Sequence, residues 1–139
     1  MDDFRQVIDL DQVTSDDTLR LARTAAEAIR GLNWLTRCDA GLDQPSVAYD
    51  ITGALMLAAS RLPQLITQIT SYLDRALAAG RLGHDFSQDP ATAVKATAIF
   101  LGDARTSAAA LASDLDAAQQ QLAPVNGNPA ALPASKDRS

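Results

Sequence analysis

The chain has 139 residues, of which 4% are aromatic and one is a cysteine, and its formal net charge is −5. A single cysteine excludes an intrachain disulfide framework and fits a reducing compartment, so we expect a cytoplasmic protein. The N-terminal residues lack the basic and apolar regions of a secretory signal. The longest uncharged runs are too short to cross a bilayer, and no membrane partner is expected.

The negative charge is concentrated at the N-terminus. Residues 1–17 contain six aspartates and one base, which accounts for the whole −5 and leaves eleven acidic and eleven basic residues in the remainder. A neutral body has no global field to attract nucleic acid or anionic lipid, so nucleic acid is not an expected partner. We expect residues 1–14 to form an acidic arm that docks on another surface, because apolar residues are interspersed in it: Phe4, Val7, Ile8, Leu10 and Val13.

A first helix is predicted over about residues 16–37, with Ser15 as its N-cap. Its apolar residues recur three and four positions apart: Leu21, Ala25, Ala28, Leu32 and Leu35. The other side is mainly basic and, together with Trp34, is a candidate partner-facing surface: Arg20, Arg23, Arg30 and Arg37. An acidic partner would fit this surface. Arginines without interleaved aromatic residues are weak evidence for nucleic-acid binding.

A second helix is predicted over about residues 46–80, with Ser46 as its cap and a kink or break at Pro63. Its inner face is predicted to contain Val47, Ile51, Ala54, Leu55, Ala58 and Leu62, and to continue through Ile66, Ile69, Leu73 and Ala76.

The first part of this helix is apolar most of the way round, since Asp50 is the only charged residue between Val47 and Ala59. A segment of that kind is buried on more than one side, and in a small helical protein self-association achieves this most simply. A homo-oligomer is therefore expected, with an interface of Val47, Tyr49, Gly53, Met56 and Leu57. A ligand groove is the alternative use of this surface, but no convergent polar groups accompany it.

A third helix is predicted over about residues 90–122, with Asp89 as its cap and Pro90 at its first position. A heptad-like apolar stripe runs along it: Val94, Ala98, Leu101, Ala104, Ala108, Leu111, Leu115, Ala118 and Leu122. Such a helix cannot bury its stripe alone and needs a neighbour.

The predicted fold is all-α, because alanine is frequent and the short connections make consecutive helices antiparallel neighbours. We expect an antiparallel bundle over residues 15–123, in which a long helical hairpin (46–80 and 90–122) packs with the shorter first helix. Residues 124–139 have no periodicity and little apolar content, so they are expected to form a disordered tail.

Few residues in the sequence suggest catalysis or metal binding. Cys38 and His84 fall in predicted loops at opposite ends of the second helix, on the order of 50 Å apart, too far for a nucleophile pair within one chain. His84, Asp85 and Asp89 could contribute to a metal site, but one histidine with scattered aspartates is a weak zinc signal and lacks the calcium-loop pattern. We therefore expect no catalytic residue, no metal and no cofactor.

Several short motifs lie along the predicted hairpin: Tyr49-Asp50, Gly53, Arg61-Leu62-Pro63-Gln64-Leu65, Gly80-Arg81-Leu82-Gly83-His84-Asp85 and Asp89-Pro90. In these motifs the chain resembles small helical proteins of actinobacteria that occur near conjugative or integrated elements. The resemblance covers about residues 15–122. The preference for arginine over lysine, ten to two, also suits a high-GC genome. The resemblance implies a helical fold but no activity.

A second comparison is with the WXG100-type helical hairpins that are exported by type VII secretion. Their size is similar, but Trp34 is followed by Leu35-Thr36 and precedes the first loop, and no Tyr-x-x-x-Asp/Glu signal is present.

The leading hypothesis is a non-enzymatic, self-associating helical interaction module. The alternatives are a DNA-associated accessory protein of a mobile element that uses the arginines of the first helix, and a WXG100-like exported hairpin.

Overall fold

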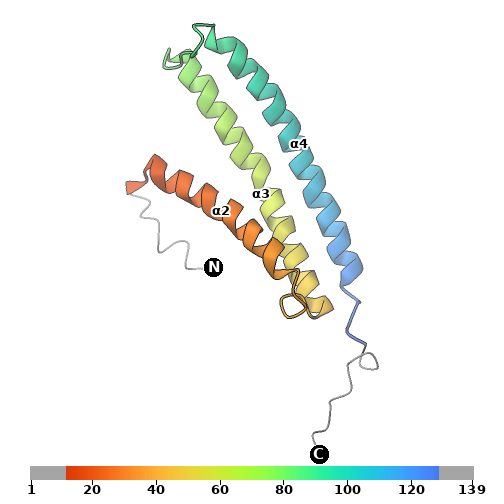
Figure 1. Cartoon of the computed structure of the whole chain (residues 1–139). Helices are drawn as coiled ribbons and strands as arrows, with labels where there is room; N and C mark the ends of the chain where they lie inside the picture. Colours follow the sequence, from red (N-terminus) through yellow and green to blue (C-terminus); the bar gives the residue numbers. More distant parts are fainter. Residues whose placement is uncertain (1–11, 129–139) are drawn as a thin grey trace, which may run out of the picture. The chain divides into compact units, whose positions relative to one another are not determined.

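The computed structural model describes residues 12–128 and confirms the all-α prediction (Figure 1). In chain order the helices are α2 (Ser15–Leu35), α3 (Pro45–Ala78) and α4 (Pro90–Leu122), and the described residues contain no strand. The chain divides into two compact units, Met1–Asp43 and Gln44–Ser139. The packing of the first helix on the hairpin stays a prediction.

Most of the predicted acidic arm and of the predicted C-terminal tail lies outside the described residues. None of the three helices contains an apolar stretch long enough to span a membrane.

In the second unit, α3 and α4 pack along each other as an antiparallel hairpin, as predicted (Figure 1). The inner seam of α3 consists of buried and half-buried residues at heptad spacing, with the buried Gly53 and Ala76 beside it: Thr52, Met56, Ala59, Pro63, Ile66, Thr70, Leu73 and Leu77. The predicted inner face was right at Ile66, Leu73 and Ala76. It was wrong by about one residue, or 100° around the helix, at Ala54, Ala58, Leu62 and Ile69. Leu62 and Ile69, expected inside, are 40% and 44% exposed.

The inner seam of α4 also differs from its predicted stripe. It keeps a strict heptad, in which every residue except the exposed Arg105 is buried or half-buried: Val94, Ala98, Leu101, Arg105, Ala108, Ala112, Leu115, Gln119 and Leu122. Ala104, Leu111 and Ala118, which were predicted to be inside, are exposed. The sequence pattern misled here because the true seam contains an arginine and a glutamine, which a count of apolar residues leaves out.

These two polar residues fix the register of the hairpin. The Arg105 guanidinium Nη1 donates to the Thr67 hydroxyl at 3.2 Å, and the Gln119 amide donates to the backbone carbonyl of Tyr49 at 3.4 Å. Gly53 lies against the Gln119 amide, and a Cβ at Gly53 would stand 2.3 Å from its Nε2. In an antiparallel pair, the numbers of residues that face each other have a constant sum, and in these two bonds it is about 170. Ile69 on α3 therefore lies across from Phe100 on α4.

Pro63 lies within α3, which continues through it from Pro45 to Ala78. Proline lacks the N–H that would bond the carbonyl four residues earlier. The Thr67 hydroxyl donates to the Pro63 carbonyl at 2.9 Å. Pro63 is half-buried on the inner seam, so packing against α4 accompanies the lost backbone bond.

The ends of the helices follow elementary capping chemistry. Asp89 caps α4 as predicted, because its carboxylate accepts the N–H of Ala91 at 3.0 Å. The predicted caps Ser15 and Ser46 were wrong: Thr14 caps α2, and Gln44 precedes Pro45 without a side-chain cap. Gly80, at φ +69°, closes α3 with the bonds of a Schellman motif, in which the Arg81 N–H reaches the Ala76 carbonyl.

The hairpin core consists of small side chains. Among the described residues the buried apolar ones are Ala59, Ala76, Val94 and Ala108, and no large side chain is fully buried. Small residues let two backbones approach closely, but each of them removes little apolar area from water.

We predict that Ala108→Leu lowers the free energy of unfolding by about 1–3 kcal/mol, because the closely packed seam has no room for three more carbons. The adjacent Ala109 is exposed, so Ala109→Leu should change stability by less than about 0.5 kcal/mol. Urea unfolding followed by circular dichroism measures both. Equal stabilities for the two variants would contradict the packing described here.

The N-terminus of α2 has a capping box. The Thr14 hydroxyl accepts the Asp17 N–H at 3.3 Å, and the Asp17 carboxylate accepts the Thr14 N–H at 3.1 Å and the Thr14 hydroxyl at 3.0 Å. The Thr14 N–H, then its hydroxyl, and lastly the nearby Arg20 lower the pKa of Asp17 below its ordinary 3.8.

We therefore predict that α2 loses helix in acid as Asp17 is protonated. A carboxylate with a lowered pKa stabilises the folded helix above pH 3.8, and this contribution disappears as the pH falls through the pKa of the folded state. Thr14→Ala removes the hydroxyl bond and should raise the pKa of Asp17, which carboxyl NMR titration measures. An unchanged Asp17 pKa in Thr14→Ala would disprove this account.

Candidate interaction surfaces

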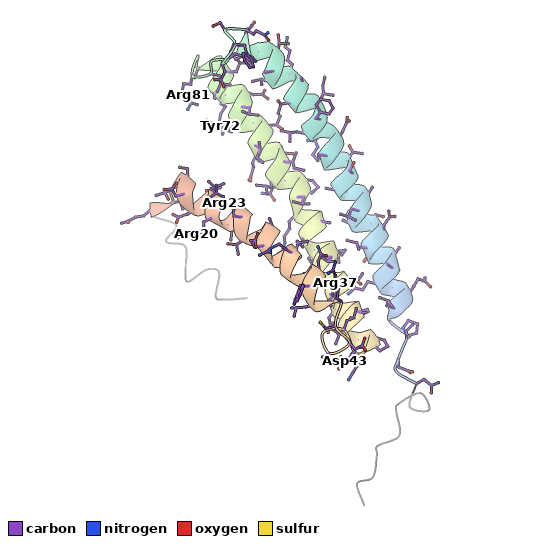
Figure 2. All side chains as sticks on the ribbon, viewed as in Figure 1. Arg20, Arg23, Arg37, Asp43, Tyr72 and Arg81 are labelled. Carbon is purple, nitrogen blue, oxygen red and sulfur yellow. The ribbon has the colours of Figure 1, made fainter. Side chains whose placement is uncertain are left out.

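One side of α2 carries the arginines that were predicted to face a partner. Arg20, Arg23 and Arg30 follow heptad spacing along the helix, with Glu27 and Trp34 on the same side. Arg37 lies just beyond the last helical residue, Leu35, so it continues the row from the following turn. Figure 2 shows Arg20 and Arg23 near one end of α2 and Arg37 near the other.

Acidic neighbours on α2 partly neutralise this row. Arg20 pairs with Asp17, and the Arg30 Nε donates to the Glu27 carboxylate at 2.9 Å. Among the described residues no ion pair is found for Arg23 or Arg37. Both arginines and Glu27 are highly exposed, so the two pairs contribute little to stability. Of the four arginines in the row, Arg23 and Arg37 therefore remain without an ion pair among the described residues.

Trp34 stands on the arginine side of α2 and is 69% exposed. It lines an open groove of about 400 Å³ with five neighbours from the same unit: Glu27, Arg30, Gly31, Asn33 and Arg37. An exposed tryptophan beside a cation is a common anchor in protein interfaces. Sequence analysis predicted it to be partner-facing, and its exposure is compatible with that prediction.

The apolar stripe of α2 is exposed as well. The helix has no buried residue. Leu32 is half-buried, and the other large apolar side chains of the stripe and its flank are more than 40% exposed: Leu19, Leu21, Ile29 and Leu35. An amphipathic helix in this state retains an apolar surface that another helix can cover.

The predicted oligomer interface on α3 falls into two parts. Gly53 is buried against Gln119 and Met56 is half-buried on the inner seam, so both take part in the hairpin itself. Val47 and Tyr49 are half-buried, and Leu57 is 42% exposed. Of this set, Leu57 remains the most accessible to another molecule.

We predict that Met56→Asp destabilises the hairpin by about 1–3 kcal/mol, because a carboxylate would be desolvated on the inner seam. Ser60, one turn later, is exposed, so Ser60→Asp should stay within about 0.5 kcal/mol of the unmodified chain. Urea unfolding at low protein concentration separates this effect from any loss of self-association. A Met56→Asp hairpin as stable as the Ser60→Asp control would contradict this placement of Met56.

The outside of the hairpin carries an apolar surface that sequence analysis did not predict there. In an antiparallel pair, the positions one residue before each inner-seam position fall on the same side of both helices. These positions define the outer apolar face: Leu62, Leu65, Ile69 and Tyr72 on α3, and Phe100, Ala104 and Leu111 on α4. The large side chains among them are 40–73% exposed, and Tyr72 projects to the outside of the hairpin (Figure 2).

The opposite side of the hairpin is mainly polar, although Leu57 and Ile99 on it are 42% and 65% exposed. It contains the positions one residue after the inner seam, among them Gln64, Thr67 and Asp74 on α3 and Thr106, Ser113 and Asp116 on α4. A shallow pocket of about 110 Å³ on this side is lined by Thr67 and Ser71 from α3 and by Gly102 and Arg105 from α4. The hairpin is thus amphipathic as a whole.

The residues considered for catalysis or metal binding lie in the connections. Cys38 is an exposed free thiol after α2, and the His84 Nδ1 accepts the Phe86 N–H at 3.1 Å between α3 and α4. Asp89 is engaged as the α4 cap. Within residues 12–128, no group of three or more histidine, cysteine, aspartate or glutamate side chains is arranged to hold a metal ion.

Comparison of the chain with protein-family models, with curated protein sequences and with solved structures gave no match.

Proposed function

We propose that the protein is a non-enzymatic helical interaction module that self-associates. The observation that carries this proposal is the contrast within the hairpin between its core and its surface. The residues buried in the core are three alanines and a valine, whereas the large apolar side chains of the outer apolar face remain exposed. A small domain needs most of its apolar surface removed from water to be stable. Association supplies the burial that the hairpin lacks.

The arginine side of α2 is the proposed contact for a second, acidic protein partner. Arg23 and Arg37 have no ion pair among the described residues, and Trp34 stands between Arg30 and Arg37 in the row. The pairing of Arg20 and Arg30 with acidic neighbours weighs against phosphate binding, which favours several unpaired cations. A cytoplasmic setting is part of the proposal and agrees with a free thiol at Cys38.

We predict that light scattering coupled to size-exclusion chromatography gives a mass of at least twice the 14.7 kDa of one chain at micromolar concentration. The mass should fall towards that of one chain on dilution and change little with salt, because apolar burial drives the association. A constant mass of 14.7 kDa over the whole concentration range would disprove self-association.

A further inference from the structure

We propose that the outer apolar face of the hairpin is the dimer interface and that its occupant is the same face of a second copy. The inference rests on the proposed self-association and specifies the surface that performs it. It replaces an interface centred on Val47–Ala59, much of which is used inside the hairpin, with one centred on Leu65, Ile69 and Phe100.

The first argument is area. A fully exposed large side chain presents about 200 Å², so the six large residues of the outer apolar face expose on the order of 600 Å². The alanines between them add to this surface. A stable interface buries about 800 Å² per partner, whereas the largest apolar patch of a monomer is about 300–600 Å². The face is therefore at the upper limit of the apolar patch of a monomer, and the alanines bring it towards the area that each partner of a stable dimer buries.

The second argument is charge. A symmetric dimer brings the same residues of both copies together, so an interface with charges of one sign would repel itself. The outer positions of α3 from Ile51 to Tyr72 carry no charge: Ile51, Leu55, Ala58, Leu62, Leu65, Ile69 and Tyr72. On α4 the outer positions from Thr97 to Ala118 carry one charge, Asp114. Such a face is complementary to itself.

The third argument is closure. Each helix of the hairpin has two adjacent heptad seams, one for its neighbour in the hairpin and one facing outward, which is the pattern of a four-helix bundle. Two hairpins joined by their outer apolar faces place their polar sides, with Gln64 and Asp116, on the surface of the bundle. No large apolar face of the hairpin is then left to recruit a third copy through the hairpin.

The test uses opposite charges on the outer apolar face of the full chain. Leu65→Glu with Ile69→Glu gives an acidic variant, and Leu65→Lys with Ile69→Lys gives a basic one. We expect each variant alone to be a monomer, with its dimer dissociation constant raised by about tenfold or more, because like charges meet across the interface. An equimolar mixture should recover the dimer mass in light scattering.

The matched control is Ser60→Glu with Gln64→Glu, which places two charges at the same spacing on the polar side of α3, where both residues are exposed. It should remain a dimer. If the acidic outer-face variant loses its helical circular dichroism signal, Phe100→Glu tests the same face from α4, where the replaced side chain is 73% exposed.

The outcomes distinguish the two proposals. Dimers that persist in both outer-face variants would overturn this interface and leave self-association intact. If the unmodified chain is a monomer and the outer-face variants lose stability, both proposals are overturned. The outer apolar face would then be covered by another segment of the same chain. Dissociation of the outer-face variants, retention of the control dimer and recovery on mixing would together establish the interface.

Discussion

The close packing of α3 on α4 is the constraint on which the rest of the structure depends. It is made by alanines, one valine and half-buried residues such as Pro63 and Met56, so the two backbones approach closely while little apolar area is buried. The hydrogen bonds from Arg105 to Thr67 and from Gln119 to Tyr49 set the register of this packing. A seam of small residues gives a well-defined geometry but a modest gain in stability, and this imbalance leaves the hairpin with apolar surface to cover.

The orientation of the seam decides which residues remain on the surface. Because each helix turns its heptad seam inward, the adjacent stripe, one residue earlier in sequence, turns outward on the same side of both helices. Leu65 and Ile69 on α3 therefore come to lie beside Phe100 on α4, although some 30 residues separate them in the sequence. An apolar face that spans two helices is a property of the hairpin and not of either helix alone.

The electrostatics of α2 illustrate how local pairing changes the meaning of a charge pattern. Four arginines in a row suggest a strong cationic surface. Asp17 and Glu27 lie three residues before Arg20 and Arg30, respectively, and form ion pairs with them, while Asp17 also completes the capping box with Thr14. The cationic character that remains is concentrated at Arg23, which lies between the two ion pairs, and at Arg37, which follows them.

The sequence by itself determined the helices, their approximate bounds, the Asp89 cap and the antiparallel hairpin, because these depend on local periodicity, on capping residues and on the short connections. It predicted a second apolar surface on α3 but assigned it to Val47, Tyr49, Gly53, Met56 and Leu57. Only the tertiary structure decided that Met56 and Gly53 are used inside the hairpin and that Leu62, Leu65 and Ile69 face outward. The physical reason is that two heptad stripes 100° apart on one helix are both apolar, so the choice between them rests on which one fits the partner helix. That fit also involves bonds that no apolar pattern reveals, from the half-buried Gln119 to Tyr49 and from the exposed Arg105 to Thr67.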